Sequence, residues 1–168
     1  MKTPFFLSLF AACFLTLTSE GQWSEIQHFW PDNIQEGHTF SASTSMDGNT
    51  AVFGSMFDIN LTGKADIYEK NTTSGQWEHV KSMYPPGFNT MEQYGRSVAV
   101  SGDIIVVGAS HNDDAGMDEG AAYIYYRDQG GDDNWGLVKT IYHTSPNMVG
   151  SSTQFGAAVD ISGDDIIV

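Results

Sequence analysis

One pattern in the sequence occurs three times, and this repetition limits the architecture more than any single residue does. The copies begin at Phe40, Tyr94 and Phe155, 54 and then 61 residues apart. Each has an aromatic residue, a small residue, a short apolar run, a tight turn and a second apolar run. The first two copies then continue into glycine and a small residue. Such an interval predicts a row of similar structural units.

The turn inside each copy predicts a β-hairpin. Gly48, Gly102 and Gly163 each follow Asp or Ser between two short β-rich runs. Glycine accepts the positive φ that tight hairpin turns require. We therefore expect residues 98–100 and 104–107 to form paired antiparallel strands.

Two further strands complete each unit. Residues 63–68 and 120–125 match each other as a third strand, and residues 77–84 and 135–142 match as a fourth. Four short antiparallel strands per repeat are typical of a β-propeller blade. The predicted fold class is therefore all-β, with four-stranded antiparallel propeller blades in an incomplete ring of about two and a half repeats. A stacked β-sandwich is the alternative, but a sandwich does not require a repeated pattern.

A tryptophan opens each fourth strand, at Trp77 and Trp135, and also stands at Trp23. A tryptophan that recurs in each blade is expected to pack between blades. Residues 22–31 match a fourth strand with no first three strands before them. We expect them to close the ring by joining strands from the far end of the protein.

The expected organisation is a signal peptide followed by a partial propeller. The predicted boundaries are residues 1–21 for the signal peptide, 22–168 for the propeller, 22–31 for the ring-closing strand, 40–85 for repeat 1, 94–146 for repeat 2 and 155–168 for a truncated repeat 3. Because the sequence stops inside the third hairpin, we expect a fragment of a longer protein.

The first residues have the pattern of a secretory signal. Lys2 precedes an apolar run over residues 5–17, which is short for a membrane span. A buried N-terminal helix is the alternative, but the run shows no amphipathic period. Cys13, the one cysteine, lies inside the run, so the mature protein would contain no disulfide. We expect the protein to be secreted or displayed at the cell surface.

The charge balance limits the partners. The chain has 21 Asp and Glu against 7 Lys and Arg, for a net charge of −14. Such a chain repels phosphate backbones and anionic lipid surfaces. We expect no nucleic-acid partner, no membrane insertion after signal removal, and an extracellular protein or glycan as ligand. Sequons at Asn60 and Asn71 would carry glycans if the host is eukaryotic.

The repeats resemble the FG-GAP repeat, whose family includes the N-terminal propeller of integrin α chains. Gly95 and Gly156 follow an aromatic residue, as in "FG", and residues 107–109 read Val-Gly-Ala, which is most of "GAP". The first copy departs from the pattern, with Ser41 in place of glycine. The resemblance covers residues 22–168 and implies a propeller of about seven repeats, here in a short-turn secreted variant.

The same resemblance raises the question of calcium. Integrin-type repeats often carry a D-x-D-x-D-G loop, but the hairpin turns here hold one or two carboxylates, so that site does not carry over. A second candidate is the acidic loop with Asp113, Asp114, Asp118 and Glu119, whose oxygens could surround one cation. A solvated surface loop is the alternative that we favour, because the spacing matches no EF-hand. The sequence indicates no certain cofactor, and Ca²⁺ is the one ion whose binding it leaves undecided.

No catalytic motif is recognisable, since HExxH, GxSxG and phosphate-loop patterns are missing. The repeats diverge mainly in their loops, which favours binding over catalysis. We expect a secreted or cell-surface module for macromolecular recognition or adhesion with no catalysis of its own. The alternative is the propeller scaffold of an extracellular carbohydrate-active enzyme or sugar-binding protein, with Tyr125, Tyr126 and Trp30 as candidate stacking residues.

Overall fold

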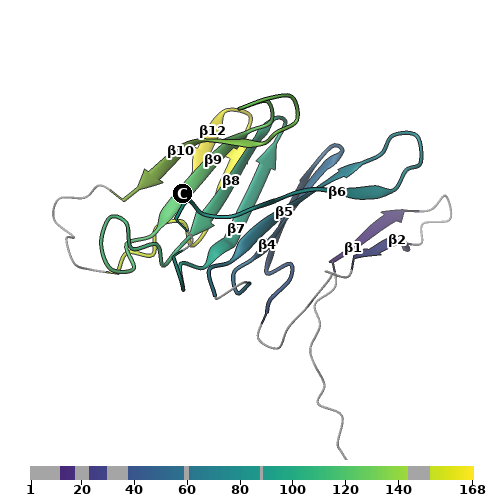
Figure 1. Ribbon diagram of the computed structural model, residues 1–168. Helices are drawn as coiled ribbons and strands as arrows, with labels where there is room; N and C mark the ends of the chain where they lie inside the picture. The colour runs from purple at the N-terminus through teal and green to yellow at the C-terminus, as the bar shows by residue number, and fades with distance from the viewer. Residues whose placement is uncertain (1–11, 18–22, 30–37, 59–60, 88, 144–151) are drawn as a thin grey trace, which may run out of the picture.

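The structure is a computed structural model that describes residues 12–17, 23–29, 38–58, 61–87, 89–143 and 152–168. These residues form strands, turns and loops, with no helix among them. The strands make two four-stranded antiparallel sheets and two hairpins, and the described residues do not close a ring (Figure 1). The predicted all-β class with four-stranded propeller blades is confirmed.

Each four-stranded sheet is one blade whose strands follow sequence order. Blade 1 consists of β3 (Ser43–Asp47), β4 (Thr50–Ser55), β5 (Lys64–Lys70) and β6 (Trp77–Met83). Blade 2 consists of β7 (Tyr94–Ser101), β8 (Ile104–Ala109), β9 (Ala121–Tyr126) and β10 (Gly136–Tyr142). The hairpins are β1 (Ala12–Leu17) with β2 (Trp23–Phe29), and β11 (Asp160–Ser162) with β12 (Asp165–Ile167).

The predicted hairpin turns are confirmed. Gly48, Gly102 and Gly163 have φ values of 57°, 54° and 59°. Each opens a two-residue turn between the first two strands of its repeat. Because only glycine takes this conformation without steric cost, the turn positions read from the sequence fix the register of both strands.

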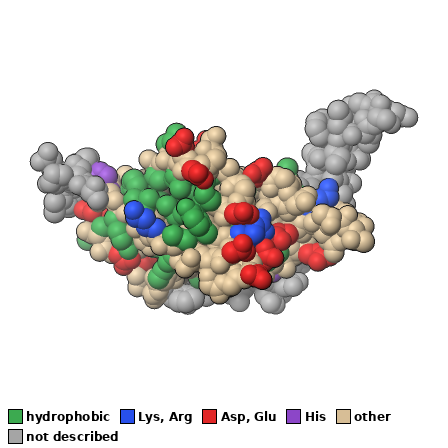
Figure 2. All heavy atoms as spheres, turned by 90° about the horizontal axis from the view of Figure 1, so that it is seen from above, with side chains coloured by type: hydrophobic (Ala, Val, Ile, Leu, Met, Phe, Trp, Pro, Cys, Tyr) green, Lys and Arg blue, Asp and Glu red, His purple; other side chains and the backbone are tan. Residues whose placement is uncertain are grey.

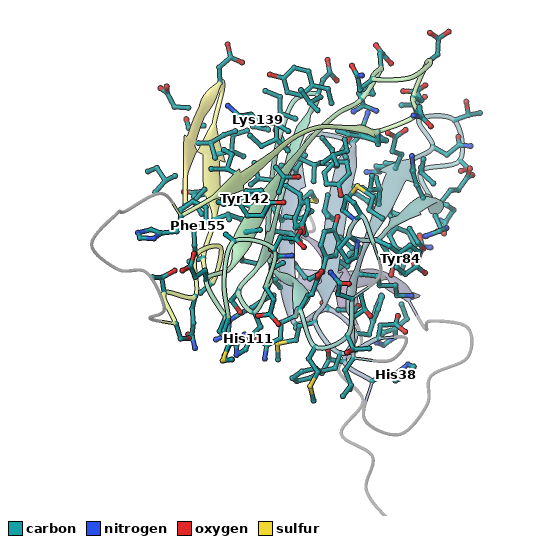
Figure 3. All side chains as sticks on the ribbon, turned by 60° about the vertical axis from the view of Figure 1, so that its left-hand side comes forward. His38, Tyr84, His111, Lys139, Tyr142 and Phe155 are labelled. Atoms are coloured by element: carbon teal, nitrogen blue, oxygen red, sulfur yellow. The ribbon has the colours of Figure 1, made fainter. Side chains whose placement is uncertain are left out.

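The blades lie face to face in chain order, with blade 1, blade 2 and the β11–β12 hairpin side by side (Figure 3). The main core lies between blades 1 and 2. Its fully buried members include Val52, Ile67, Tyr94, Ile105, Val107, Tyr123 and Trp135. Residues 105–109 of β8 are all buried, because this strand has a neighbouring layer on each face. Trp135 belongs to this core, as expected of a residue that packs between blades. Trp77 is buried in a separate cluster with Ala51 and Phe53 of blade 1. The side chain of Trp23 lies outside the described residues.

A repeated hydrogen bond joins each blade to the next repeat. Ser43 Oγ donates to the carbonyl oxygen of Gly95 at 2.9 Å. In the next repeat, Ser97 Oγ donates to the carbonyl oxygen of Gly156 at 2.8 Å. The first strand of each blade therefore holds the "FG" glycine of the following repeat.

The "GAP" glycines lie beneath the same carbonyl groups. A Cβ atom added to Gly54 would overlap the carbonyl oxygen of Gly95, and one added to Gly108 would overlap that of Gly156. The "FG" glycines themselves have φ values of 82° for Gly95 and 83° for Gly156. Backbone therefore packs directly on backbone at each junction, and no side chain fits between.

The start of each third strand completes the junction. Gly63 forms an isolated parallel bridge with Tyr94, and Gly120 forms the same bridge with Phe155. A Cβ atom on either glycine would overlap the carbonyl oxygen of its aromatic partner. Each repeat therefore has glycine at the positions where the backbone of the next repeat crosses it.

Arg127 adds a polar link between the blades at the hairpin-turn end. Its guanidinium donates to Glu69 and to Thr50 Oγ1 of blade 1, the latter at 2.9 Å. Its Nε donates to Asp103 of its own blade at 2.6 Å, and the group lies 4.4 Å from the centre of the Trp135 ring. Figure 2 shows basic atoms ringed by Asp and Glu side chains at this end. The link joins the same two blades as the glycine junction, at the opposite end of the strands.

The N-terminal predictions are only partly covered by the described residues. Of the expected signal peptide, residues 12–17 form β1, a strand rather than the helix considered as an alternative. The expected ring-closing segment forms β2, which pairs with β1. Gln27 of β2 also exchanges two hydrogen bonds with the backbone of Trp77, at 2.8 and 3.0 Å. Signal processing and ring closure both stay predictions.

The glycine junction predicts a large effect of one methyl group. Gly108→Ala should lower the free energy of unfolding by about 3 kcal/mol, because the new Cβ meets backbone that cannot move aside. The matched control is Gly102→Ala, where a Cβ meets nothing within 4 Å and only the positive φ is strained, at about 1 kcal/mol. Urea unfolding measures both, and equal losses would contradict the junction.

Ser41 occupies the first-repeat position of the "FG" glycine and has a φ of 62°. Ser41→Gly should therefore raise the free energy of unfolding by about 1 kcal/mol, because it relieves a left-handed serine. Ser43→Gly, two residues on, should have the opposite sign, since it removes the hydrogen bond to Gly95. Thermal unfolding of the two variants provides the comparison, and a destabilised Ser41→Gly protein would refute the expectation.

Candidate functional site

The loops between second and third strands lie at one end of the blades, together with the connection between the blades. In each blade the hairpin turn and the third-to-fourth-strand loop lie at one end. The β4–β5 and β8–β9 loops and the β6–β7 connection lie at the opposite end, which we call the loop end. Figure 3 shows His38 and His111 at the loop end and Lys139 at the other. The candidate acidic residues all belong to the loop end.

Two of the four predicted carboxylates of the β8–β9 loop accept hydrogen bonds from different donors. Asp113 Oδ1 accepts the backbone N–H of Asp118 at 2.7 Å, which closes the loop on itself. Asp114 Oδ2 accepts the hydroxyl of Tyr142 at 3.2 Å, and Glu119 is buried. Within the described ranges, no group of three or more His, Cys, Asp or Glu side chains is placed to hold a metal ion. Calcium binding by these four residues stays a prediction.

A carboxylate that sequence analysis missed lies beneath this loop. Glu92, in the β6–β7 connection, is 1 % exposed. Its Oε1 accepts hydrogen bonds from Asn89 at 2.8 Å and from Asn112 at 3.1 Å. Its Oε2 has no hydrogen-bond partner among the described residues. Burial raises the pKa of Glu92, and the negative charges of Asp114 and Asp113 add to the rise.

The repeat alignment contained a signal for this site. Glu92 and Asn112 occupy the repeat positions of His38 and Asp58, and that pair is also in contact, at 3.3 Å between His38 Nδ1 and Asp58 Oδ1. Asp58 pairs further with Lys64 at 2.9 Å. The same backbone plan therefore brings a polar pair together at the loop end of each blade, with different chemistry in each.

Residues 77–125 match the FG-GAP repeat family. The chain carries an FG-GAP repeat. The matched segment runs from the start of β6 through β9 and includes both the "FG" and the "GAP" glycines. No curated protein matches the chain significantly.

Of the two sequon asparagines, Asn71 lies within the described residues. Asn71 lies in the turn after β5, where its Oδ1 accepts the backbone N–H of Thr73 at 2.9 Å and its amide donates to Glu78. The second sequon residue, Asn60, lies outside the described residues. No helix in the described part of the chain is long and apolar enough to cross a membrane.

Three tyrosines, Tyr94, Tyr123 and Tyr125, form a cluster in the core between blades 1 and 2. Tyr94 donates to the hydroxyl of Tyr125 at 2.6 Å and packs edge-on against Tyr123, with ring centres 5.2 Å apart. Burial raises the pKa of Tyr125 to about 12, although the bond from Tyr94 opposes the rise. Burial also raises the pKa of Tyr94 and Tyr123. The cluster is therefore neutral in the folded protein well above physiological pH.

This cluster predicts alkaline destabilisation. An unfolded tyrosine has a pKa near 10, so between pH 10 and about 12 the unfolded chain releases phenolic protons that the folded chain keeps. The unfolded state then binds fewer protons, and the free energy of unfolding falls as pH rises. Denaturation at a series of pH values, with tyrosinate absorbance, measures this.

Tyr125→Phe removes one titrating group of the cluster and should flatten the pH slope. The variant should also be less stable at every pH, because Tyr94 loses its acceptor. The quantity that tests the prediction is the change of the free energy of unfolding with pH, not its absolute value. An unchanged slope would show that other groups cause the alkaline loss.

Proposed function

We propose that this chain is the recognition module of a secreted or cell-surface protein, and that it binds an extracellular macromolecule through the loop end without catalysis of its own. The observation that carries the proposal is the exposure of large apolar side chains on three separate loops there. Leu61 is 41 % exposed, Met91 63 % and Met117 78 %. Exposed apolar groups mark interaction surfaces, and methionine adapts to varied partners.

Charge supports the same surface and suggests the partner's chemistry. Asp113 and Asp114 are exposed beside Met117 in the β8–β9 loop. The chain as a whole carries a net charge of −14. A protein partner with a basic, partly apolar surface would gain from both contacts and would be steered toward the acidic chain.

One polar cluster of Ser82, His79 and Asp66 is not arranged as a serine relay. Ser82 Oγ donates to Asp66 Oδ1 at 2.5 Å. The Nε2 atom of His79 lies 3.2 Å from that hydroxyl and 3.3 Å from the same carboxylate oxygen. In a serine relay the histidine uses one nitrogen for serine and the other for the carboxylate. Here one nitrogen faces both groups, so the histidine is not oriented as a relay base.

Sugar binding is the second candidate, and a pocket at the hairpin-turn end favours it. The pocket, of about 360 Å³, is lined by Ser101, Gly102, Asp103, Ile104, Tyr126, Gly163 and Asp164. Tyr126 is 46 % exposed, so its ring could stack on a sugar while the carboxylates accept hydroxyl hydrogens. The expectation that Tyr125 would stack on a sugar is wrong, because Tyr125 points into the core and is buried. Trp30 lies outside the described residues.

The test compares the two surfaces on the same probes. The full chain is screened by biolayer interferometry against purified extracellular-matrix proteins and against a glycan array. A Met91→Ser/Met117→Ser double variant should weaken binding to a matrix protein at least tenfold. The control, Val138→Ser, changes a side chain that is 45 % exposed on β10 and should leave binding unchanged.

The remaining outcomes separate the two candidates. Glycan binding that is lost in Tyr126→Ala and kept in the double methionine variant would establish the second candidate in place of the first. A double variant that binds its matrix protein as the original chain does would refute the loop end as the binding surface. A chain that binds neither panel would refute both.

A further inference from the structure

We propose that the loop end holds a Ca²⁺ site built on Glu92, Asp114 and the side-chain oxygen of Asn112. This set shares Asp114 with the acidic-loop residues considered from the sequence, and it adds Asn112 of the same loop and Glu92 of the β6–β7 connection beneath it. The inference goes beyond partner binding and does not rest on it, because a cation can be titrated without any partner.

The first observation is an unpaired buried oxygen. Glu92 is 1 % exposed, and its Oε2 accepts no hydrogen bond within the described residues. Neither Glu92 nor Asp114 has a Lys or Arg ion-pair partner in the described part of the chain. A buried carboxylate oxygen without a donor, in a group without a counter-charge, costs free energy that a bound cation would recover.

The second observation is an excess of acceptors around one amide. Asn112 Nδ2 lies 3.1 Å from Glu92 Oε1, 3.3 Å from Asp114 Oδ2 and 3.2 Å from the Tyr123 hydroxyl. The amide has two hydrogens for these three oxygens. Asn112 Oδ1 now accepts the backbone N–H of Asp114 at 3.2 Å. Rotating the amide by half a turn would break that bond and bring Oδ1 beside Glu92 and Asp114 as a third oxygen ligand.

The ligand chemistry selects the cation. Carboxylate and amide oxygens are hard ligands, and Ca²⁺ accepts an irregular set of them that water completes. Asp114 is exposed, so water reaches the site. Mg²⁺ demands a near-ideal octahedron and should bind more weakly. With two carboxylates, we expect a dissociation constant on the order of 10⁻⁴ to 10⁻³ M.

Terbium luminescence tests the site directly, because Tb³⁺ substitutes for Ca²⁺ and is excited by energy transfer from nearby tyrosine. Tyr123 and Tyr142 donate or accept hydrogen bonds at the proposed ligands and are suitable donors of that energy. The full chain, stripped with chelator, should show sensitised Tb³⁺ emission that Ca²⁺ displaces and Mg²⁺ displaces poorly. Saturating Ca²⁺ should also raise the thermal unfolding midpoint.

The variants decide which residues bind. Glu92→Gln and Asp114→Asn should each weaken Tb³⁺ and Ca²⁺ binding at least tenfold. Asp132→Asn makes the same charge change on the exposed β9–β10 loop, at the other end, and should bind normally. Far-UV circular dichroism checks folding, and Asp114→Asn decides alone if Glu92→Gln does not fold.

Three results would overturn the proposal. The first is an original chain whose Tb³⁺ emission and unfolding midpoint do not respond to Ca²⁺. The second is a folded Glu92→Gln protein that binds like the original. The third is loss of binding in Asp118→Asn but not in Asp114→Asn, which would place the cation in the outer loop instead.

Discussion

The structure depends on a contact in which the backbone of one repeat lies directly on the backbone of the blade before it. The carbonyl groups of Gly95 and Gly156 pack on Gly54 and Gly108, and a serine from the preceding blade bonds each of them. The closeness of this contact allows both faces of β8 to be buried. The contact also gives a physical reason for the family pattern, since each glycine in "FG" and "GAP" lies where the backbones of two successive repeats touch.

The other contacts between the blades contribute less to holding them together than the glycine junction does. Arg127 joins Glu69 and Asp103 at the solvent-exposed end, where salt screens ion pairs and their net contribution is small. The tyrosine cluster adds buried apolar area, but other residues of similar volume could fill the same space in the core. A glycine junction has no such substitute, because any side chain would force the blades apart.

The junction leaves the loop end free to vary. At one pair of repeat positions, blade 1 has His38 and Asp58, while blade 2 has Glu92 and Asn112. The backbone brings both pairs together in the same way, so local substitution alone changes their chemistry. The acidic loop was recognisable because its carboxylates lie within seven residues of one another in the sequence. Glu92 was not, because its burial comes from the β6–β7 connection folding beneath a loop some twenty residues later, as the Asn112–Glu92 separation shows.

The sequence by itself determined the repeat, the position of each hairpin turn and the strands that flank it, because these depend on residues close together in the chain. Glycine at a turn and an apolar run on either side are local signals. Only the tertiary structure decided which side chains face a neighbouring blade. Tyr125 and Tyr126 are adjacent in β9, yet one lies in the core and the other is 46 % exposed. Successive strand residues point to opposite faces, and what covers each face is set by a blade far away in the sequence.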